Sequence, residues 1–180
     1  MLLELLAVLL TWLVPDAAAA GLARTAPEPM PLPVARAHLA RAALASAVHR
    51  VDPALVLAIA AHESHYDEGA VTPEPGGLYS CGVMTPVPGA PCRPQTVLEG
   101  YLAGAAHLRG WIGGPGSPCH GNLRCALLGY AGGGERGLIG ACKAGPVHLR
   151  PGVDTCSIAE VFLARARWIR REAGISSPES

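Results

Sequence analysis

The strongest local signal in this chain of 180 residues is a helix start at Asp52-Pro53. The Asp52 side chain can cap a helix, and Pro53 suits the first helical position because no N–H is needed there. The residues that follow are mostly apolar and include neither Gly nor Pro. We therefore predict a helix from Pro53 to about Ser64.

One glutamate stands near the end of this helix, on its apolar side. Glu63 lies seven residues after Val56 and four after Ile59, the spacing that marks the core-facing stripe of a helix. The helix dipole also disfavours negative charge in the last turn by roughly 0.3–1 kcal/mol. Both effects would raise the pKa of Glu63 toward that of a general acid. Spacing alone leaves a second interpretation open, a solvated glutamate paired with Arg50 or His65.

Elsewhere in the chain, the positions of Gly and Pro separate helices from loops. Helices are predicted at residues 34–49, 95–109, 122–130 and 157–173. The last of these opens with Ser157 and Glu160, the spacing of a capping box, and ends at Gly174. Residues 72–94 and 143–155 are predicted to be loops, and no segment of useful length alternates as a half-buried strand would. The length and the pattern predict a single, mainly α domain.

The first 20 residues predict a secretory signal peptide. Residues 2–14 form an apolar run interrupted only by Glu4 and Thr11, and the alanines at 17–20 provide a cleavage site. The run is shorter than the roughly 20 residues that cross a bilayer. No basic residue precedes it, so an uncleaved anchor is the alternative. The predicted organisation is a signal peptide at 1–20, an extended Pro-rich linker at 21–33 and one domain at 34–180.

Six cysteines lie beyond the predicted Glu63 helix. In an exported chain this even number indicates disulfides that staple long loops. Six cysteines allow 15 pairings. We favour pairs of neighbours along the chain: Cys81 with Cys92, Cys119 with Cys125, and Cys142 with Cys156. A metal site is disfavoured, because the chain has no C-x-x-C pair and its histidines at 62 and 65 are three positions apart, not four as in zinc proteases. We expect a secreted or periplasmic protein without metal or cofactor.

The charge balance disfavours one large class of partner. The chain has 14 basic and 14 acidic residues and a formal net charge of zero. A neutral chain offers no basic stripe to a nucleic-acid backbone, so a DNA or RNA partner is disfavoured. Half of the residues are hydrophobic, which is enough to bury a core.

Three segments, in order, resemble motifs of one known family. Residues 51–64, V-D-P-A-L-V-L-A-I-A-A-H-E-S, resemble the opening of the soluble lytic transglycosylase domain, where a helix beginning V-D-P-x-L ends in Glu-Ser. Residues 82–85, G-V-M-T, resemble the family's G-[LV]-M-Q element, with Thr85 in place of glutamine; residues 77–80 are an alternative register. Residues 129–133 resemble A-Y-N-x-G, with Ala131 in place of asparagine. The resemblance covers residues 34–172.

This resemblance implies a lysozyme-like helical fold and an enzyme that cuts peptidoglycan between N-acetylmuramic acid and N-acetylglucosamine. In the family one glutamate protonates the bridging oxygen and then removes the proton of the C6 hydroxyl, which closes a 1,6-anhydro ring. Glu63 matches this catalytic residue. By the same resemblance Ser64 orients the glutamate, and Met84, Thr85 and Tyr130 line the sugar subsites. The expected partner is the glycan strand, with cell-envelope proteins as further candidates, and the expected state is a monomer.

Other functions stay open. A lysozyme-type hydrolase needs a second carboxylate roughly 5–9.5 Å from the first, and Asp67 or Glu68 could provide it. A non-catalytic protein that binds peptidoglycan or assists envelope assembly on the same fold is favoured by the substitutions at Thr85 and Ala131. A small secreted disulfide protein with chance similarity would leave the ordered motifs unexplained.

Overall fold

The computed structural model describes residues 2–74, 78–85, 96–113, 116–132, 137–147 and 154–176. These residues form eight α-helices, one hairpin and a short 3-10 turn. The helices are α1 (Leu2–Leu13), α2 (Asp16–Thr25), α3 (Leu32–His49), α4 (Pro53–Glu63), α5 (Val97–Gly113), α6 (Leu123–Gly132), α7 (Leu138–Ala144) and α8 (Ile158–Ala173). The hairpin is β1 (Val71–Glu74) with β2 (Leu78–Cys81), and the 3-10 turn is η1 (Thr155–Ser157). The prediction of a mainly α domain is confirmed.

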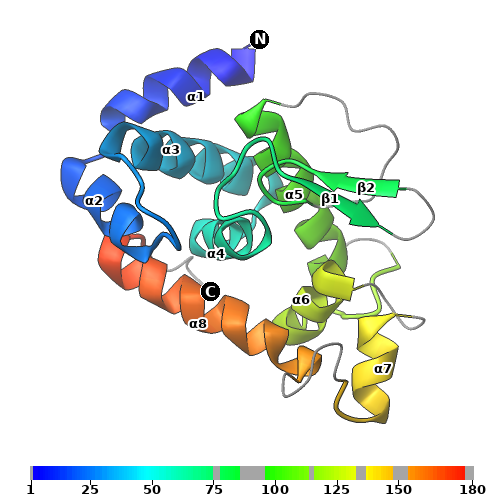
Figure 1. Cartoon of the computed structure of the whole chain (residues 1–180). Coiled ribbons are helices and arrows are strands. Elements are labelled where there is room, and N and C mark those ends of the chain that lie inside the picture. Colours follow the sequence, from blue (N-terminus) through cyan, green and yellow to red (C-terminus); the bar gives the residue numbers. More distant parts are fainter. Residues whose placement is uncertain are drawn as a thin grey trace.

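Helix α4 is the central element, and Figure 1 shows it nearly end-on between α3 and α8. Every residue from Ala54 to Ala61 is at most 1% exposed. A helix that is apolar all round must be enclosed all round, so the core extends well beyond the stripe inferred from the sequence. The predicted cap is confirmed, because the Asp52 carboxylate accepts the Ala54 N–H at 2.9 Å. Asp52 also pairs with Arg170, which attaches the start of α4 to α8.

A buried polar cluster lies where α3 meets α5. Nδ1 of His38 lies 3.0 Å from the hydroxyl oxygen of Tyr101, within hydrogen-bonding distance. The Tyr66 ring packs against His38 with a centroid distance of 5.1 Å. Burial, helped by the charge of Arg41, lowers the pKa of His38 from 6.5 to about 4. The imidazole is therefore neutral at pH 7.

The predicted loop at residues 72–94 contains a hairpin, which corrects the expectation of no strands. β1 and β2 pair antiparallel, with Val71 opposite Cys81 and Thr72 opposite Ser80. Each strand has only four residues, which is too few to recognise an alternation of apolar and polar residues in the sequence. Pro73 also argued against a strand, but a two-stranded ribbon has open edges where a residue without an N–H is tolerated. The hairpin lies beside α5 and leads into residues 82–85 (Figure 1).

The helix ends agree in part with the sequence. The predicted capping box is wrong, because the Ser157 side chain makes no capping bond to α8. Its hydroxyl instead donates to the carbonyl of Asp154, at 2.6 Å, within the turn η1. At the other end Gly174 adopts the expected left-handed conformation, with φ of 65°.

Two of the predicted disulfides are present. Cys119 pairs with Cys125, with a Cα–Cα distance of 5.4 Å, and Cys142 pairs with Cys156, with a Cα–Cα distance of 5.6 Å. The first attaches the segment before α6 to that helix, and the second joins α7 to η1. Cys92, the partner predicted for Cys81, lies outside the described residues.

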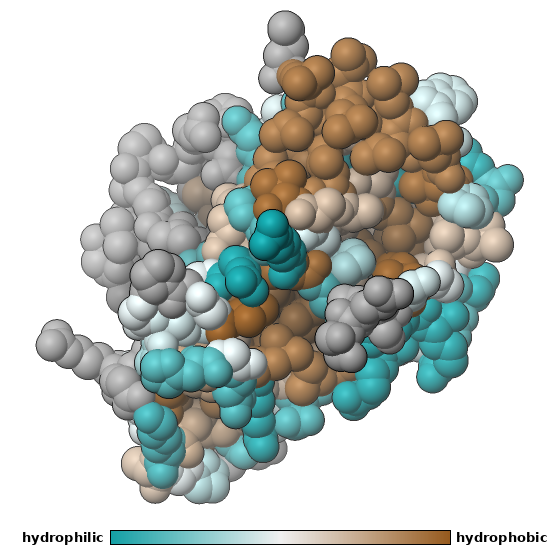
Figure 2. Space-filling view, turned by 180° about the vertical axis from the view of Figure 1, so that it is seen from behind, coloured by the Kyte–Doolittle hydropathy of each residue, from teal (hydrophilic) through white to brown (hydrophobic). Residues whose placement is uncertain are grey.

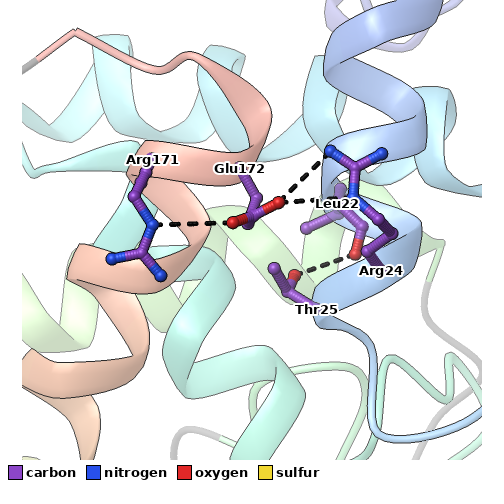
Figure 3. A network of polar contacts seen from close by, with 5 residues as sticks. All are labelled: Leu22, Arg24, Thr25, Arg171 and Glu172. Atoms are coloured by element: carbon purple, nitrogen blue, oxygen red, sulfur yellow. Dashed lines mark hydrogen bonds and ion pairs between the residues drawn. The ribbon is translucent and has the colours of Figure 1, made fainter.

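Helix α2 occupies part of the segment predicted to be an extended linker. It packs against α3 and α8, and Leu22 is fully buried. Gly21 lies so close to α8 that a Cβ there would be 2.0 Å from the backbone oxygen of Glu172. Figure 3 shows the adjoining ion pair, in which Arg24 meets Glu172 at 3.2 Å. The helix forms because residues 16–25 are rich in alanine and contain no proline.

Helix α1 differs from the other helices in exposing a large apolar surface. Leu2, Leu5, Trp12 and Leu13 are each more than half exposed. Figure 2 shows this surface as a continuous brown area at the top of the molecule. Within the described residues no single helix is long and apolar enough to span a membrane. Taken together, α1 and α2 pass the same test of length and composition, with a bend of 101° between them.

The neutral state of His38 predicts a loss of stability in mild acid. The pKa of His38 is lower in the folded chain than in the unfolded chain. Its contribution to the free energy of unfolding is therefore complete above pH 6.5 and declines as the pH falls toward 4. The change should reach about 3 kcal/mol at most. Urea unfolding at pH 7.5 and pH 4.5 should show a smaller difference for His38→Gln than for the wild type. Replacement of the exposed His120 by Asn is the control, and an unchanged pH dependence in His38→Gln would contradict the assignment.

Candidate active site

Glu63 is the last residue of α4, and its side chain is half-buried. The chain turns sharply after it, since His65 and Tyr66 have φ values of 56° and 67°. Residues other than glycine rarely adopt this left-handed backbone conformation. Two such residues in succession indicate backbone strain that the surrounding structure maintains. The turn returns the Tyr66 ring to the core while Glu63 stays at the core boundary.

Ser64 joins the end of α4 to the segment that follows the hairpin. Its hydroxyl oxygen lies 2.6 Å from the carbonyl oxygen of Val83 and 3.1 Å from that of Ala60. The hydroxyl has a single proton, which the shorter contact favours. Ser64 therefore holds the end of α4 against the segment that follows the hairpin.

Thr85 contacts the glutamate directly. Its hydroxyl donates to Oε2 of Glu63 at 3.2 Å, across 22 positions of sequence. The segment curls back to make this contact, since Gly82 has a φ of 85° and Thr85 a φ of 39°. The Thr85 N–H donates to the carbonyl of Gly82 at 3.1 Å and closes the turn. The first two motifs are thus adjacent in space.

Tyr130 brings the third motif to the same place. Its hydroxyl donates to the carbonyl of Met84 at 2.8 Å, so it holds the 82–85 segment from the side of α6. Burial, together with the nearby charge of Glu63, raises the pKa of Tyr130 well above 10. The hydroxyl therefore stays protonated and acts as a donor at any ordinary pH.

Met84 occupies a different position from the one expected. Its side chain is fully buried and does not line a sugar subsite. It packs against α5 at Gly104, where a Cβ would lie 2.5 Å from the Met84 sulfur. Gly104 lowers the helix propensity of α5, and this close approach explains its presence. Met84 therefore contributes core packing and a backbone acceptor for Tyr130.

The other ionisable residues near Glu63 have separate partners. Asp67 accepts the Gly69 N–H at 2.8 Å in an exposed turn, and Glu68 is also exposed. His62 stacks edge-on against Phe162, whereas His65 pairs with Glu28 at 3.4 Å. The two histidines point to different elements and do not converge on one metal. Among the described residues no group of three His, Cys, Asp or Glu side chains could hold a metal ion.

Two residues that the sequence analysis passed over stand beside this site. His107 of α5 contacts the Tyr130 ring at a centroid distance of 5.1 Å. One helical turn further, Trp111 donates its indole N–H to Nε2 of His107 at 3.2 Å. Both line a surface pocket of about 390 Å³ together with Gly116, Ser117 and others. Their spacing of four residues on one helix was the only sequence signal, and no motif contains them.

A larger pocket lies elsewhere, between α1, α2, α3 and the end of α8. It has a volume of about 530 Å³ and is lined by apolar residues such as Val14, Leu39 and Ile175. None of the described residues that line it is ionisable, so they provide no group for acid–base chemistry. The polar cluster around Glu63 is the better candidate for catalysis.

Comparison with known proteins adds no relative: no family model, no curated protein and no solved structure matches this chain. Function must therefore be inferred from the residues and their geometry.

Loss of the Tyr130 hydroxyl should destabilise the site. Tyr130→Phe leaves the buried Met84 carbonyl without this donor, which should lower the free energy of unfolding by about 1–3 kcal/mol. Urea denaturation measures the difference. Tyr79→Phe is the matched control, because Tyr79 is 41% exposed and its change should stay within about 0.5 kcal/mol. Equal stability of the two variants would show that the hydroxyl does not hold the 82–85 segment.

Proposed function

We propose that this protein is a lytic transglycosylase that cuts peptidoglycan strands, with Glu63 as its single acid/base. The observation that supports the proposal most is the contact between the Thr85 hydroxyl and Glu63 Oε2 at 3.2 Å. It joins two motifs recognised separately in the sequence, and the hydroxyl of Tyr130 adds the third at 2.8 Å from the Met84 carbonyl. If the similarity of these three short segments were due to chance, there would be no reason for the segments to meet around one carboxyl group.

In the proposed reaction protonated Glu63 gives its proton to the oxygen that bridges N-acetylmuramic acid and N-acetylglucosamine. The bond from that oxygen to C1 of N-acetylmuramic acid breaks, with stabilisation of the cationic centre by the sugar's own N-acetyl group. The C6 hydroxyl oxygen then attacks C1, and its proton passes to the Glu63 carboxylate. The products are a shortened strand with a 1,6-anhydro ring and a strand with a new hydroxyl, and Glu63 is again protonated. No water is consumed.

The neighbours of Glu63 suit a carboxyl that changes its protonation state twice. Thr85 is a neutral donor, so it can hold Oε2 without adding a charge. Ser64 fixes the backbone at the end of α4 through the Val83 carbonyl. These contacts would keep the carboxyl in one orientation through both proton transfers, which is what efficient acid–base catalysis requires.

A second candidate is a non-catalytic protein that binds peptidoglycan on the same fold. Ala131 favours it, since an apolar side chain that packs against the core replaces the family's asparagine. An amide that could contact substrate is thereby lost. A lysozyme-type hydrolase is less favoured, because the Asp67 carboxylate already caps its own turn.

We also propose that the protein is exported and works in the cell envelope, as a monomer on glycan strands. The two disulfides among the described residues are compatible with an oxidising compartment. The exposed apolar surface of α1 supports either a signal peptide or an anchor.

The central test is the release of muropeptides from purified peptidoglycan, identified by mass spectrometry. The wild type should release products that end in 1,6-anhydro-N-acetylmuramic acid, and Glu63→Gln should lower the rate by roughly 10²–10⁴. Glu160→Gln is the control, because Glu160 is exposed on α8. Products with reducing ends would indicate a hydrolase instead. A folded wild type that sediments with the peptidoglycan and releases nothing would indicate the binding protein.

The role of Thr85 predicts a smaller, specific effect. Thr85→Ala removes the donor to Glu63 and should reduce the rate about tenfold, which corresponds to roughly 1.4 kcal/mol. Thr85→Ser keeps the hydroxyl and should restore most of the rate. If serine and alanine behave alike, the hydrogen bond does not contribute to the reaction.

A further inference from the structure

The last turns of α5 carry two aromatic side chains next to the candidate active site. Trp111 follows His107 by four residues, and its indole N–H donates to Nε2 of His107 at 3.2 Å. The two rings are nearly perpendicular, at 87°. Burial lowers the pKa of His107 below its usual 6.5, so the ring is neutral at pH 7 and able to accept this bond.

These rings continue a row of contacts that begins at Glu63. Glu63 accepts the Thr85 hydroxyl, and Tyr130 binds the adjacent carbonyl of Met84. The Tyr130 ring then contacts His107, with a centroid distance of 5.1 Å. Trp111 is the next side chain in the row and lines the pocket of about 390 Å³. The pocket is therefore connected to the acid/base through packed side chains.

The pocket wall is held in place from several directions. The backbone of α6 lies against the indole, since a Cβ at Gly129 would be 2.5 Å from two Trp111 ring atoms. The Ser117 hydroxyl donates to the Trp111 carbonyl and accepts the Cys119 N–H at 3.2 Å. Cys119 is in turn linked to Cys125 of α6. A binding site of this kind is preorganised, and less entropy is lost when a ligand binds.

The chemistry of the lining indicates a neutral, amphipathic ligand. The described residues that line the pocket are alanine, glycine, proline, serine, histidine and tryptophan, with no Asp, Glu, Lys or Arg among them. Its volume lies within the roughly 300–1,000 Å³ of small-molecule sites. The Ser117 hydroxyl is already used on the Trp111 carbonyl, so the group offered to a ligand is the indole, which suits the C–H groups on the faces of a sugar ring.

We propose that this pocket is a sugar subsite that holds one N-acetylhexosamine unit of the glycan strand on the indole of Trp111, beside the bond cleaved at Glu63. The proposal rests on the proposed function and specifies how that site recognises its strand. His107 also lines the pocket, and we assign it a positioning role, because its Nε2 fixes the indole.

Binding can be measured separately from cleavage. In a Glu63→Gln background, tri-N-acetylchitotriose is titrated into the full chain, and tryptophan fluorescence and calorimetry are recorded. The chain has only three tryptophans, so each can be tested. Trp111→Leu should abolish the fluorescence change on binding and raise the dissociation constant roughly tenfold. Trp12→Phe and Trp168→Phe are the matched controls, because these residues are 81% and 37% exposed on other helices, and both should behave like the parent.

The positioning role of His107 has its own readout. His107→Gln keeps an acceptor for the indole N–H and should retain more of the affinity than His107→Leu, while circular dichroism shows both variants folded. Equal affinities of these two variants would remove His107 from the proposal.

The outcomes distinguish this subsite from the proposed function. Unchanged trimer affinity in folded Trp111→Leu would overturn the subsite, whatever the muropeptide assay shows. Failure of the trimer to bind the parent would overturn it as well. Binding that depends on Trp111, in a protein whose wild type releases no anhydro products, would support the subsite and reject the catalytic function.

Discussion

The enclosure of α4 by the other helices is the constraint on which the rest of the structure depends. Its residues from Ala54 to Ala61 are buried on every side, so polar groups are confined to its ends. At the first end Asp52 caps the helix and binds Arg170 of α8. At the second end the Ser64 hydroxyl holds the 82–85 segment. Glu63 is the last residue of α4 and lies at this second end. Its carboxyl group is at the boundary of the core, while its backbone is part of the enclosed helix.

Close backbone approach is the second requirement of the site, and glycine provides it twice. Gly104 lets the Met84 side chain pack against α5, and Gly129 lets the Trp111 indole pack against α6. Each glycine costs its helix about 0.5–1 kcal/mol relative to alanine. The complete burial of Met84 offsets this, since burying a side chain of its size contributes about 1.5–3 kcal/mol. The lower helix propensity at these two glycines is thus the condition for the close packing of Met84 and of Trp111.

Local signals predicted much of the fold, and tertiary contacts account for what they missed. The cap at Asp52 and the end at Gly174 follow from single residues and were predicted within one or two positions. The hairpin was missed because strands of four residues, one with Pro73, are stabilised by pairing rather than by pattern. In the candidate site, the motifs predicted which segments accompany Glu63, but motif identity does not specify side-chain direction, so the buried side chain of Met84 was not foreseen. Trp111 lies outside every motif, and only the folded chain places it against His107 and Gly129.

The substitution at Thr85 shows how the turn and the glutamate depend on each other. A threonine side chain is two carbons shorter than the glutamine of the motif, so it reaches Glu63 only where the backbone is close. The left-handed conformations of Gly82 and Thr85, together with the Ser64 contact, bring it to that distance. A hydroxyl used on Glu63 has no remaining proton for a substrate, and Ala131 has no polar group at all. In the proposed function, strand recognition would then come from other side chains, which is the role that we propose for the pocket at Trp111.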